Sequence, residues 1–229
     1  RRYFDVFEKV TPSYTGKVWV GAAGYVEQAF AGRSGARAQA QLGWAALRPG
    51  TTHDLAIARE GAGRMYYRLG ITYAPQRADL PALDAGFLVR RTYSAVEDPS
   101  DVTRAPDGTW RVKLGAKVLV TVEATATTAR HGVAVVDPLP AGFEAIDERL
   151  AVAERVAKAA RERQPWEHLS LRDNRSEAFA MDLPAGAHRL VYSVRATTPG
   201  TFRAAPAKAE EMYSPETFGR SAGEVVVVE

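Results

Sequence analysis

The sequence predicts an all-β protein built from antiparallel β-sandwich domains, and three observations support this fold class. Hydrophobic and polar residues alternate with a period of two through much of the chain after residue 13. Glycine, proline and aspartate residues typical of turns separate the alternating runs. An unbroken valine run at 225–228 is too short for a core helix and indicates a last strand that completes a sheet.

The first nine residues favour a short helix, because Tyr3, Phe4 and Phe7 fall on one helical face. Pro12 ends it, since proline restricts the residue before it and cannot continue a helix. A helix this short is marginal alone, so we expect a helical remnant that packed on a preceding domain. The chain begins without Met and without an apolar leader, which indicates a fragment or a processed chain.

In the first third of the chain, period-two alternation predicts strands at 17–22, 38–44, 53–59 and 65–73. Gly61-Ala62-Gly63 is interpreted as a hairpin turn between the last two strands. It is not a phosphate-binding loop, because no helix follows it. Two prolines and several polar residues then interrupt the alternation at 74–81, which predicts a domain boundary.

Strands resume after this boundary, and Asp107-Gly108 predicts a hairpin turn. The segment 117–125 alternates most cleanly, and we expect its valines and Ala124 to point inward. A charged loop is predicted at 96–104 and a proline-punctuated loop after residue 204. The predicted strands lie at 86–93, 109–114, 117–125, 132–136, 176–181, 188–196, 201–204 and 223–228.

One segment, 147–163, departs from this period and predicts a single short amphipathic helix. It is rich in alanine, glutamate and arginine, and Asp147 is a suitable N-cap. Its apolar stripe is mostly alanine, which gives little drive toward a membrane surface. We therefore favour packing on the flank of the sandwich over a membrane-lying or partner-binding helix.

Composition excludes several classes of function. Hydrophobic and charged residues make up 46% and 25% of the chain, as in ordinary globular proteins. The net charge is +3, and basic residues do not cluster with aromatic ones, so no nucleic-acid interface is predicted. The absence of cysteine excludes disulfides, thiolate metal sites, cysteine nucleophiles and a thioester within this chain. No run approaches the roughly 18 apolar residues of a membrane span.

Four groups of residues could in principle carry chemistry, but none of them predicts a catalytic, cofactor-binding or metal site. The histidines lack the paired spacing of metal ligands, and the three aspartates do not reproduce a calcium loop. Asp137 and Glu144 flank a tight turn, so a turn-forming role for the aspartate is favoured over a carboxylate pair for glycoside hydrolysis. No nucleophile elbow surrounds the serine. The groups are His53, His131, His168 and His188; Asp98, Asp101 and Asp107; Asp137 and Glu144; and Ser170 with His168 and Asp173.

Aromatic residues are usually part of a core, and the alternation around Trp110 places it opposite Arg111. Phe87 and Tyr93 are also weighed as core residues. For Trp166, beside Pro165, an exposed position stays open, and with Arg172 it would suit a binding surface.

Long blocks of the sequence resemble bacterial alpha-2-macroglobulin family proteins. The block MYYRLGITYAP resembles the end of their CUB-like portion, and RYFDVFEK resembles the closing helix of their thioester domain. The blocks LPALDAGFLVRRTY, VAVVDPLPAGFEA and YSVRATTPGTFRAAPAKAEEMYSPETFGRSA resemble the last β-sandwich domain, which is comparable to the receptor-binding domain of the animal proteins. The resemblance implies three parts: the end of a thioester-type domain at 1–12, a CUB-like region at 13–76, and a C-terminal macroglobulin domain at 77–229.

The resemblance implies the non-catalytic C-terminal portion of a broad-spectrum protease inhibitor, a protease trap of the periplasm or cell envelope whose parent is lipid-anchored. Its expected partners are the upstream thioester and macroglobulin domains, the proteases they trap, and an envelope protein. No enzyme activity, cofactor or thioester residue is expected in this chain. An autonomous β-sandwich module that binds a glycan or a surface protein is the alternative.

Overall fold

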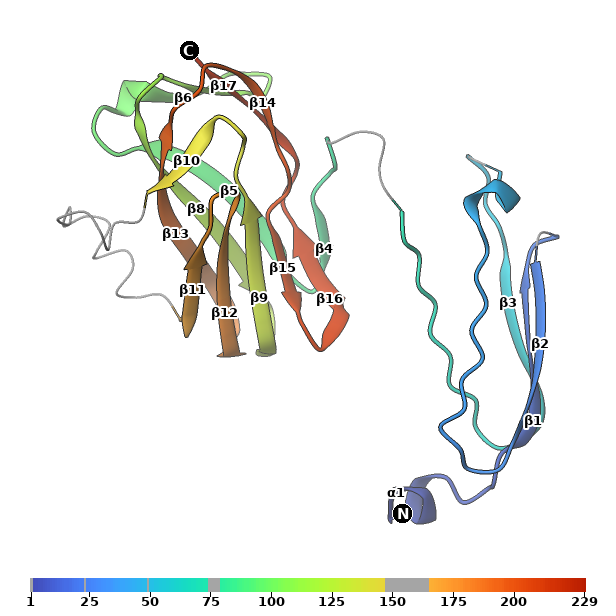
Figure 1. The fold of residues 1–229 in the computed structure, drawn as a ribbon. Helices are drawn as coiled ribbons and strands as arrows, with labels where there is room; N and C mark the ends of the chain where they lie inside the picture. The colour runs from blue at the N-terminus through green and yellow to red at the C-terminus, as the bar shows by residue number, and fades with distance from the viewer. Residues whose placement is uncertain (1, 23, 49, 74–78, 147–164) are drawn as a thin grey trace. The chain divides into compact units, whose positions relative to one another are not determined.

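The computed structural model describes residues 2–22, 24–48, 50–73, 79–146 and 165–229. The chain forms two compact units, Arg1–Tyr73 and Ala74–Glu229 (Figure 1). Antiparallel sheets dominate both units, which confirms the all-β prediction. The helix predicted at 147–163 lies outside the described residues. Within the described residues, no helix is long and apolar enough to span a membrane.

Unit 1 holds a short helix and a three-stranded antiparallel sheet in the order β2-β1-β3. The helix confirms the one predicted at the N-terminus. The left-handed backbone of Gly21, with φ of 50°, allows the tight turn between β1 and β2. The elements are α1 Arg2–Phe7, β1 Ser13–Val20, β2 Gly24–Ala31, the 3-10 turn η1 Trp44–Ala46, and β3 Leu55–Ala62.

Several predictions for unit 1 were wrong. The segments 38–44 and 65–73 alternate in polarity but form no strand, and Leu69 and Ile71 stay exposed. Alternating polarity shows that a segment could bury one face of a strand. A strand also needs a neighbouring strand to pair with its backbone N–H and C=O groups. The strand β2 was missed because nearly all of its side chains are solvated and it shows no alternation.

The glycines near residue 62 also differ from the prediction, because β3 runs through Gly61 and Ala62 instead of turning there. Gly61 has a φ of 116°, and a Cβ at this position would lie 2.4 Å from the carbonyl oxygen of Ser13. Glycine is required here because β1 approaches closely, not because the chain reverses.

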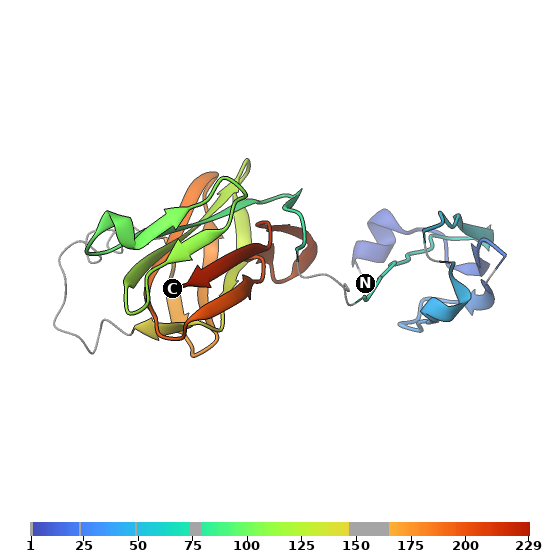
Figure 2. The same ribbon diagram turned by 90° about the horizontal axis from the view of Figure 1, so that it is seen from above.

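In the residues that the structure describes, unit 2 forms three sheets, ordered β10-β13-β8-β5, β11-β12-β9-β15-β16-β4 and β14-β17-β7-β6. Figures 1 and 2 show their strands stacked in layers. The elements are β4 Leu83–Ala85, β5 Leu88–Ala95, the 3-10 turn η2 Pro99–Asp101, β6 Val102–Arg104, β7 Trp110–Val112, β8 Lys117–Ala126, β9 Arg130–Pro138, β10 Phe143–Ile146, β11 His168–Leu171, β12 Arg175–Leu183, β13 Gly186–Ala196, β14 Gly200–Ala204, β15 Lys208–Glu211, β16 Ser214–Arg220 and β17 Glu224–Val228.

One hydrophobic core draws side chains from all three sheets of unit 2. Every second residue of β8 is buried, from Val118 to Ala126, as its alternation predicts. Phe87, Tyr93 and Trp110 also lie in this core, which confirms their assignment. Asp107-Gly108 joins β6 to β7 as a hairpin, with the amide of Gly108 donating to the carbonyl of Ala105 at 2.9 Å.

The loop predicted after residue 204 instead contains the hairpin of β15 and β16. The short strand β15 is mostly charged, so it lacks the alternation that marks a half-buried strand. Pro215 lies near the start of β16, where a missing backbone donor is tolerated. The predicted charged loop likewise ends in β6, a strand of only three residues.

Candidate functional site

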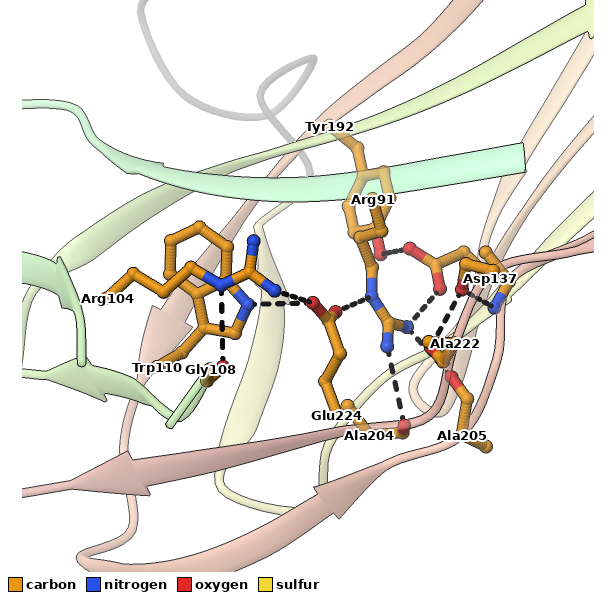
Figure 3. Close-up of polar contacts among 12 residues, drawn as sticks. Arg91, Arg104, Gly108, Trp110, Asp137, Tyr192, Ala204, Ala205, Ala222 and Glu224 are labelled. Atoms are coloured by element: carbon orange, nitrogen blue, oxygen red, sulfur yellow. Dashed lines mark hydrogen bonds and ion pairs between the residues drawn. The ribbon is translucent and has the colours of Figure 1, made fainter. Parts of the chain in front are cut away.

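A buried arginine, Arg91, organises the most unusual polar cluster of unit 2 (Figure 3). It belongs to β5, where alternate residues face the core, so its side chain enters the core between Val89 and Tyr93. Its Nη1 donates to Asp137 Oδ1 at 2.7 Å, and its Nε donates to Glu224 Oε2 at 3.2 Å. A buried charge needs such pairing, because desolvation alone would destabilise it strongly.

Two backbone carbonyls complete the contacts of the Arg91 guanidinium. Nη1 donates to the carbonyl of Ala205 at 2.9 Å, and Nη2 donates to that of Ala204 at 3.4 Å. Ala204 is the last residue of β14, and Ala205 follows it (Figure 3). One side chain on β5 therefore holds the chain where it leaves a different sheet.

Asp137 is fully buried on β9, where its second oxygen, Oδ2, accepts a hydrogen bond from the Tyr192 hydroxyl at 2.7 Å. The turn-forming role favoured from the sequence is therefore wrong: this aspartate is an ion-pair partner inside a strand. Glu144 is exposed on β10. A glycoside hydrolase needs two carboxylates that face each other across an accessible cleft, so these two acids do not form such a pair.

Glu224 joins the cluster from the start of β17 and accepts hydrogen bonds from three further strands. Besides Arg91, its donors are Trp110 Nε1 at 3.0 Å and Arg104 Nη2 at 3.4 Å. The Arg104 guanidinium also lies over the Trp110 ring, 4.9 Å from its centroid, in a cation–π contact. The ion cluster, defined as Arg91, Asp137, Tyr192 and Glu224 with Arg104 and Trp110, thus links six strands.

The electrostatics of this ion cluster suit a structural role. Burial is the largest single effect and lowers the pKa of Arg91, but Asp137, Tyr93 and Glu224 together outweigh it, so the pKa of Arg91 lies above its ordinary value. Burial raises the pKa of Asp137, while Arg91 and Tyr192 oppose that shift. Both pKa values are raised, which favours the charged form of Arg91 but the neutral form of Asp137. We take Asp137 as ionised, because both of its partners in the cluster are donors. Buried this completely, Arg91 and Asp137 are not reached by a substrate.

Removal of the hydroxyl is expected to have different effects on stability at the two buried tyrosines beside Arg91. The Tyr93 hydroxyl has no hydrogen-bond partner among the described residues, whereas that of Tyr192 donates to Asp137. We expect Tyr93→Phe to leave the free energy of unfolding unchanged or raise it by about 1 kcal/mol, and Tyr192→Phe to lower it by about 2 kcal/mol. Urea unfolding of both variants measures this. A larger loss for Tyr93→Phe than for Tyr192→Phe would contradict it.

The four histidines have separate partners. His131 Nδ1 pairs with Asp182 Oδ1 at 2.6 Å on the exposed surface, and His188 Nε2 lies 2.7 Å from the carbonyl of Pro184. His53 contacts Thr51 in unit 1, and the His168 ring lies beside that of Phe179. Within the part of the chain that the structure describes, no three potential metal ligands gather. Ser170 shares β11 with His168, and Asp173 lies in the bend after it.

Of the three aspartates considered as calcium ligands, two stabilise turns and the third forms an ion pair. Asp98 accepts from the amide of Ser100, and Asp107 from that of Thr109, each at 2.9 Å. These backbone donors lower the pKa of both carboxyls. Asp101 lies 3.2 Å from Lys113 Nζ. Each of the three carboxylates therefore has a partner within the protein.

Trp166 is 9% exposed, and its Nε1 donates to the carbonyl of Arg189 at 2.8 Å. The exposed position left open for it is therefore wrong. Arg172 Nε contacts Glu177 at 3.0 Å, and Arg175 Nε contacts the same carboxylate at 2.5 Å. The bonds from Arg175 and then Arg172 lower the pKa of Glu177. Trp166 and Arg172 do not form an exposed aromatic and cationic surface.

The comparisons with known proteins decide the family. The model of the bacterial alpha-2-macroglobulin MG10 domain matches residues 86–216, more than half of the chain. The chain belongs to the bacterial alpha-2-macroglobulin family. It is 29% identical over 185 residues to the alpha-2-macroglobulin homolog of Nostoc sp. PCC 7120, covering 79% of this chain and 10% of that protein. It is also 32% identical over 170 residues to the circularly permutated Ras protein 2 of Dictyostelium discoideum, covering 73% and 4%.

Solved structures show the same fold. The native Escherichia coli alpha-2-macroglobulin matches with a TM-score of 0.57 and 19% identity, over 100% of this chain and 14% of that one. The same protein activated by porcine elastase matches with a TM-score of 0.55 and 17% identity, over 96% and 18%. This macroglobulin chain thus spans a tenth or less of the curated relatives it matches.

The MG10 match contains Arg91, Asp137 and Tyr192, whereas Glu224 lies beyond it. Sequence reasoning about this macroglobulin chain missed Arg91, Tyr192 and Glu224 as a group. One signal was present: in the alternating run of β5, arginine occupies an inward position between Val89 and Tyr93. A charge on the apolar face of a strand indicates a buried partner.

Proposed function

We propose that this chain is a non-catalytic portion of a bacterial macroglobulin that inhibits proteases by trapping them. The MG10 match over residues 86–216 is the observation that carries this proposal. The Escherichia coli protein of the same fold is described in a state activated by porcine elastase and in one activated by trypsin. The chain would support contacts between domains and the rearrangement that accompanies trapping.

The non-catalytic role is supported by how the polar side chains are used. Arg91, Asp137 and Glu224 hold strands together, and the turn aspartates accept backbone donors. The 229 residues contain no cysteine, so covalent capture through a thioester would come from another part of the parent protein. The family resemblance favours a periplasmic or cell-envelope parent, anchored by lipid, with an envelope protein as a further partner.

The apex of the β15–β16 hairpin is the surface of unit 2 that we assign to contact with the rest of the parent. Tyr213 is 82% exposed there, and the neighbouring Met212 is 39% exposed. The amide of Met212 donates to the carbonyl of Gly132 at 2.8 Å, which fixes the apex against β9. A rigid aromatic side chain that projects into solvent is typical of residues that dominate an interface.

The experiment co-expresses this chain with the polypeptide encoded directly upstream and measures both the complex and its capture of trypsin. We expect a stable complex that retains trypsin on gel filtration, and Tyr213→Ala should weaken association by roughly tenfold. Leu169→Ala, on the exposed side of β11, is the matched control and should change little. A stable, monodisperse chain that binds neither the upstream polypeptide nor trypsin would overturn the proposal.

An autonomous module that binds a glycan is the second candidate, and the structure disfavours it. Its predicted surface depended on Trp166 and Arg172, but Trp166 is buried and Arg172 is paired with Glu177. A glycan array probed with the intact chain tests it, and selective binding would restore this candidate.

A further inference from the structure

The closing strand β17 has no hydrophobic pattern that sets its own register. Its inward residues, Val226 and Val228, are buried, and Val225 and Val227 on the other face are half-buried. A one-residue slip normally exchanges the apolar and polar faces of a strand, and this exchange makes the slip costly. In a run of four valines, each face presents valine again.

One slip in particular is hidden from the hydrophobic pattern. In the native register Phe202 of β14 opposes Val226, and Gly200 opposes Val228. A one-residue shift that brings Val225 and Val227 to these places again turns two valine side chains inward. The opposite shift brings Glu229 to the place of Val228, so it buries a carboxylate and is opposed by desolvation.

Glu224 makes contacts that distinguish the native register from a slipped one. Its side chain is 10% exposed, and it accepts hydrogen bonds from Arg91 on β5, Arg104 on β6 and Trp110 on β7 (Figure 3). Any one-residue shift turns this carboxylate to the other face of β17. Arg91 would then lose one of its two acidic partners inside the core.

We propose that Glu224 is a positioning residue that sets the register of β17 between β14 and β7. Arg91 extends this constraint beyond β17, since it also holds Asp137 on β9 and the Ala204 and Ala205 carbonyls where β14 ends. The charge at the start of the strand thus selects one of two alignments that each turn two valines inward.

The far end of β17 offers a matched comparison. Glu229 pairs with Arg111 Nη1 at 2.9 Å, but both side chains are at least half exposed. Exposed ion pairs contribute little, because solvent screens them. We therefore assign register selection to Glu224 and not to Glu229.

Disulfide trapping in this chain tests the proposal, because its 229 residues contain no cysteine. Thr201 opposes Val227 in the native register, so cysteines at 201 and 227 report that alignment. Cysteines at 201 and 226 report the slipped one, since in the native register these side chains point to opposite faces. When Glu224 is unchanged, only the cysteine pair at 201 and 227 should form a disulfide.

With Glu224→Gln, we expect the yield of the 201–226 disulfide to rise by roughly tenfold or more. The native register then loses the charge-assisted hydrogen bonds that stabilise it over the slipped one. Glu229→Gln, the control, should leave only the native disulfide. If Glu224→Gln fails to fold, Glu224→Asp keeps the charge but shortens its reach, and an intermediate rise in the slipped disulfide is expected. A folded Glu224 variant that forms only the native disulfide, or a Glu229→Gln variant that slips equally, overturns the proposal.

Discussion

Replacing Arg91 by methionine is expected to lower the free energy of unfolding of unit 2 by about 3–5 kcal/mol. Methionine keeps much of the side-chain volume but removes every donor of the guanidinium. Asp137, which is fully buried, and Glu224, which is nearly so, would then lose their shared cationic partner. The Ala204 and Ala205 carbonyls lose donors as well. Urea unfolding followed by tryptophan fluorescence measures the change.

The control for this variant is Arg111→Met, which removes a solvent-exposed ion pair with Glu229. It should cost less than about 1 kcal/mol. Similar losses for the two arginines would show that burial does not distinguish them, and would contradict the structural role of the ion cluster.

Gly219→Ala is expected to destabilise unit 2 by about 3 kcal/mol or more. A Cβ on Gly219 would lie 1.8 Å from the carbonyl oxygen of Phe87, just before β5. A backbone atom cannot move aside without disturbing the pairing of β16 with β4, in which Gly219 opposes Asp84. Thermal unfolding and the yield of folded protein report the effect.

Gly142→Ala separates a backbone clash from a side-chain clash. The Cβ there would meet the ring of Phe202 at 2.3 Å, and a ring can be replaced. We expect Phe202→Leu to recover part of the stability lost in Gly142→Ala. Partial recovery of Gly219→Ala by the same substitution would contradict the distinction.

Local patterns predicted much of unit 2. The alternation of β8 identified the inward residues, and Asp107-Gly108 identified a hairpin, because both signals depend only on residues close in sequence. In unit 1 the same kind of pattern failed at 65–73. Polarity alternates there, but the structure places no partner strand beside it.

The ion cluster shows where such local reasoning ends. Arg91 pairs with Asp137 and Glu224, which are 46 and 133 residues away, and no pattern within one strand connects them. Asp137 beside Pro138 is typical of a turn, yet it is buried as an ion-pair partner. From the sequence, Trp166 beside Pro165 could be exposed or buried. Its contact with β13 shows that it is buried.

The sequence alone determined the all-β class, the inward face of the main strands and the family to which the chain belongs. These depend on residue order and on periods of two, which persist without any knowledge of distant neighbours. Tertiary structure alone decided which buried charges meet, which alternating segments become strands, and what aligns a closing strand of four identical valines. Each of these depends on the energy of contacts between residues far apart in the chain.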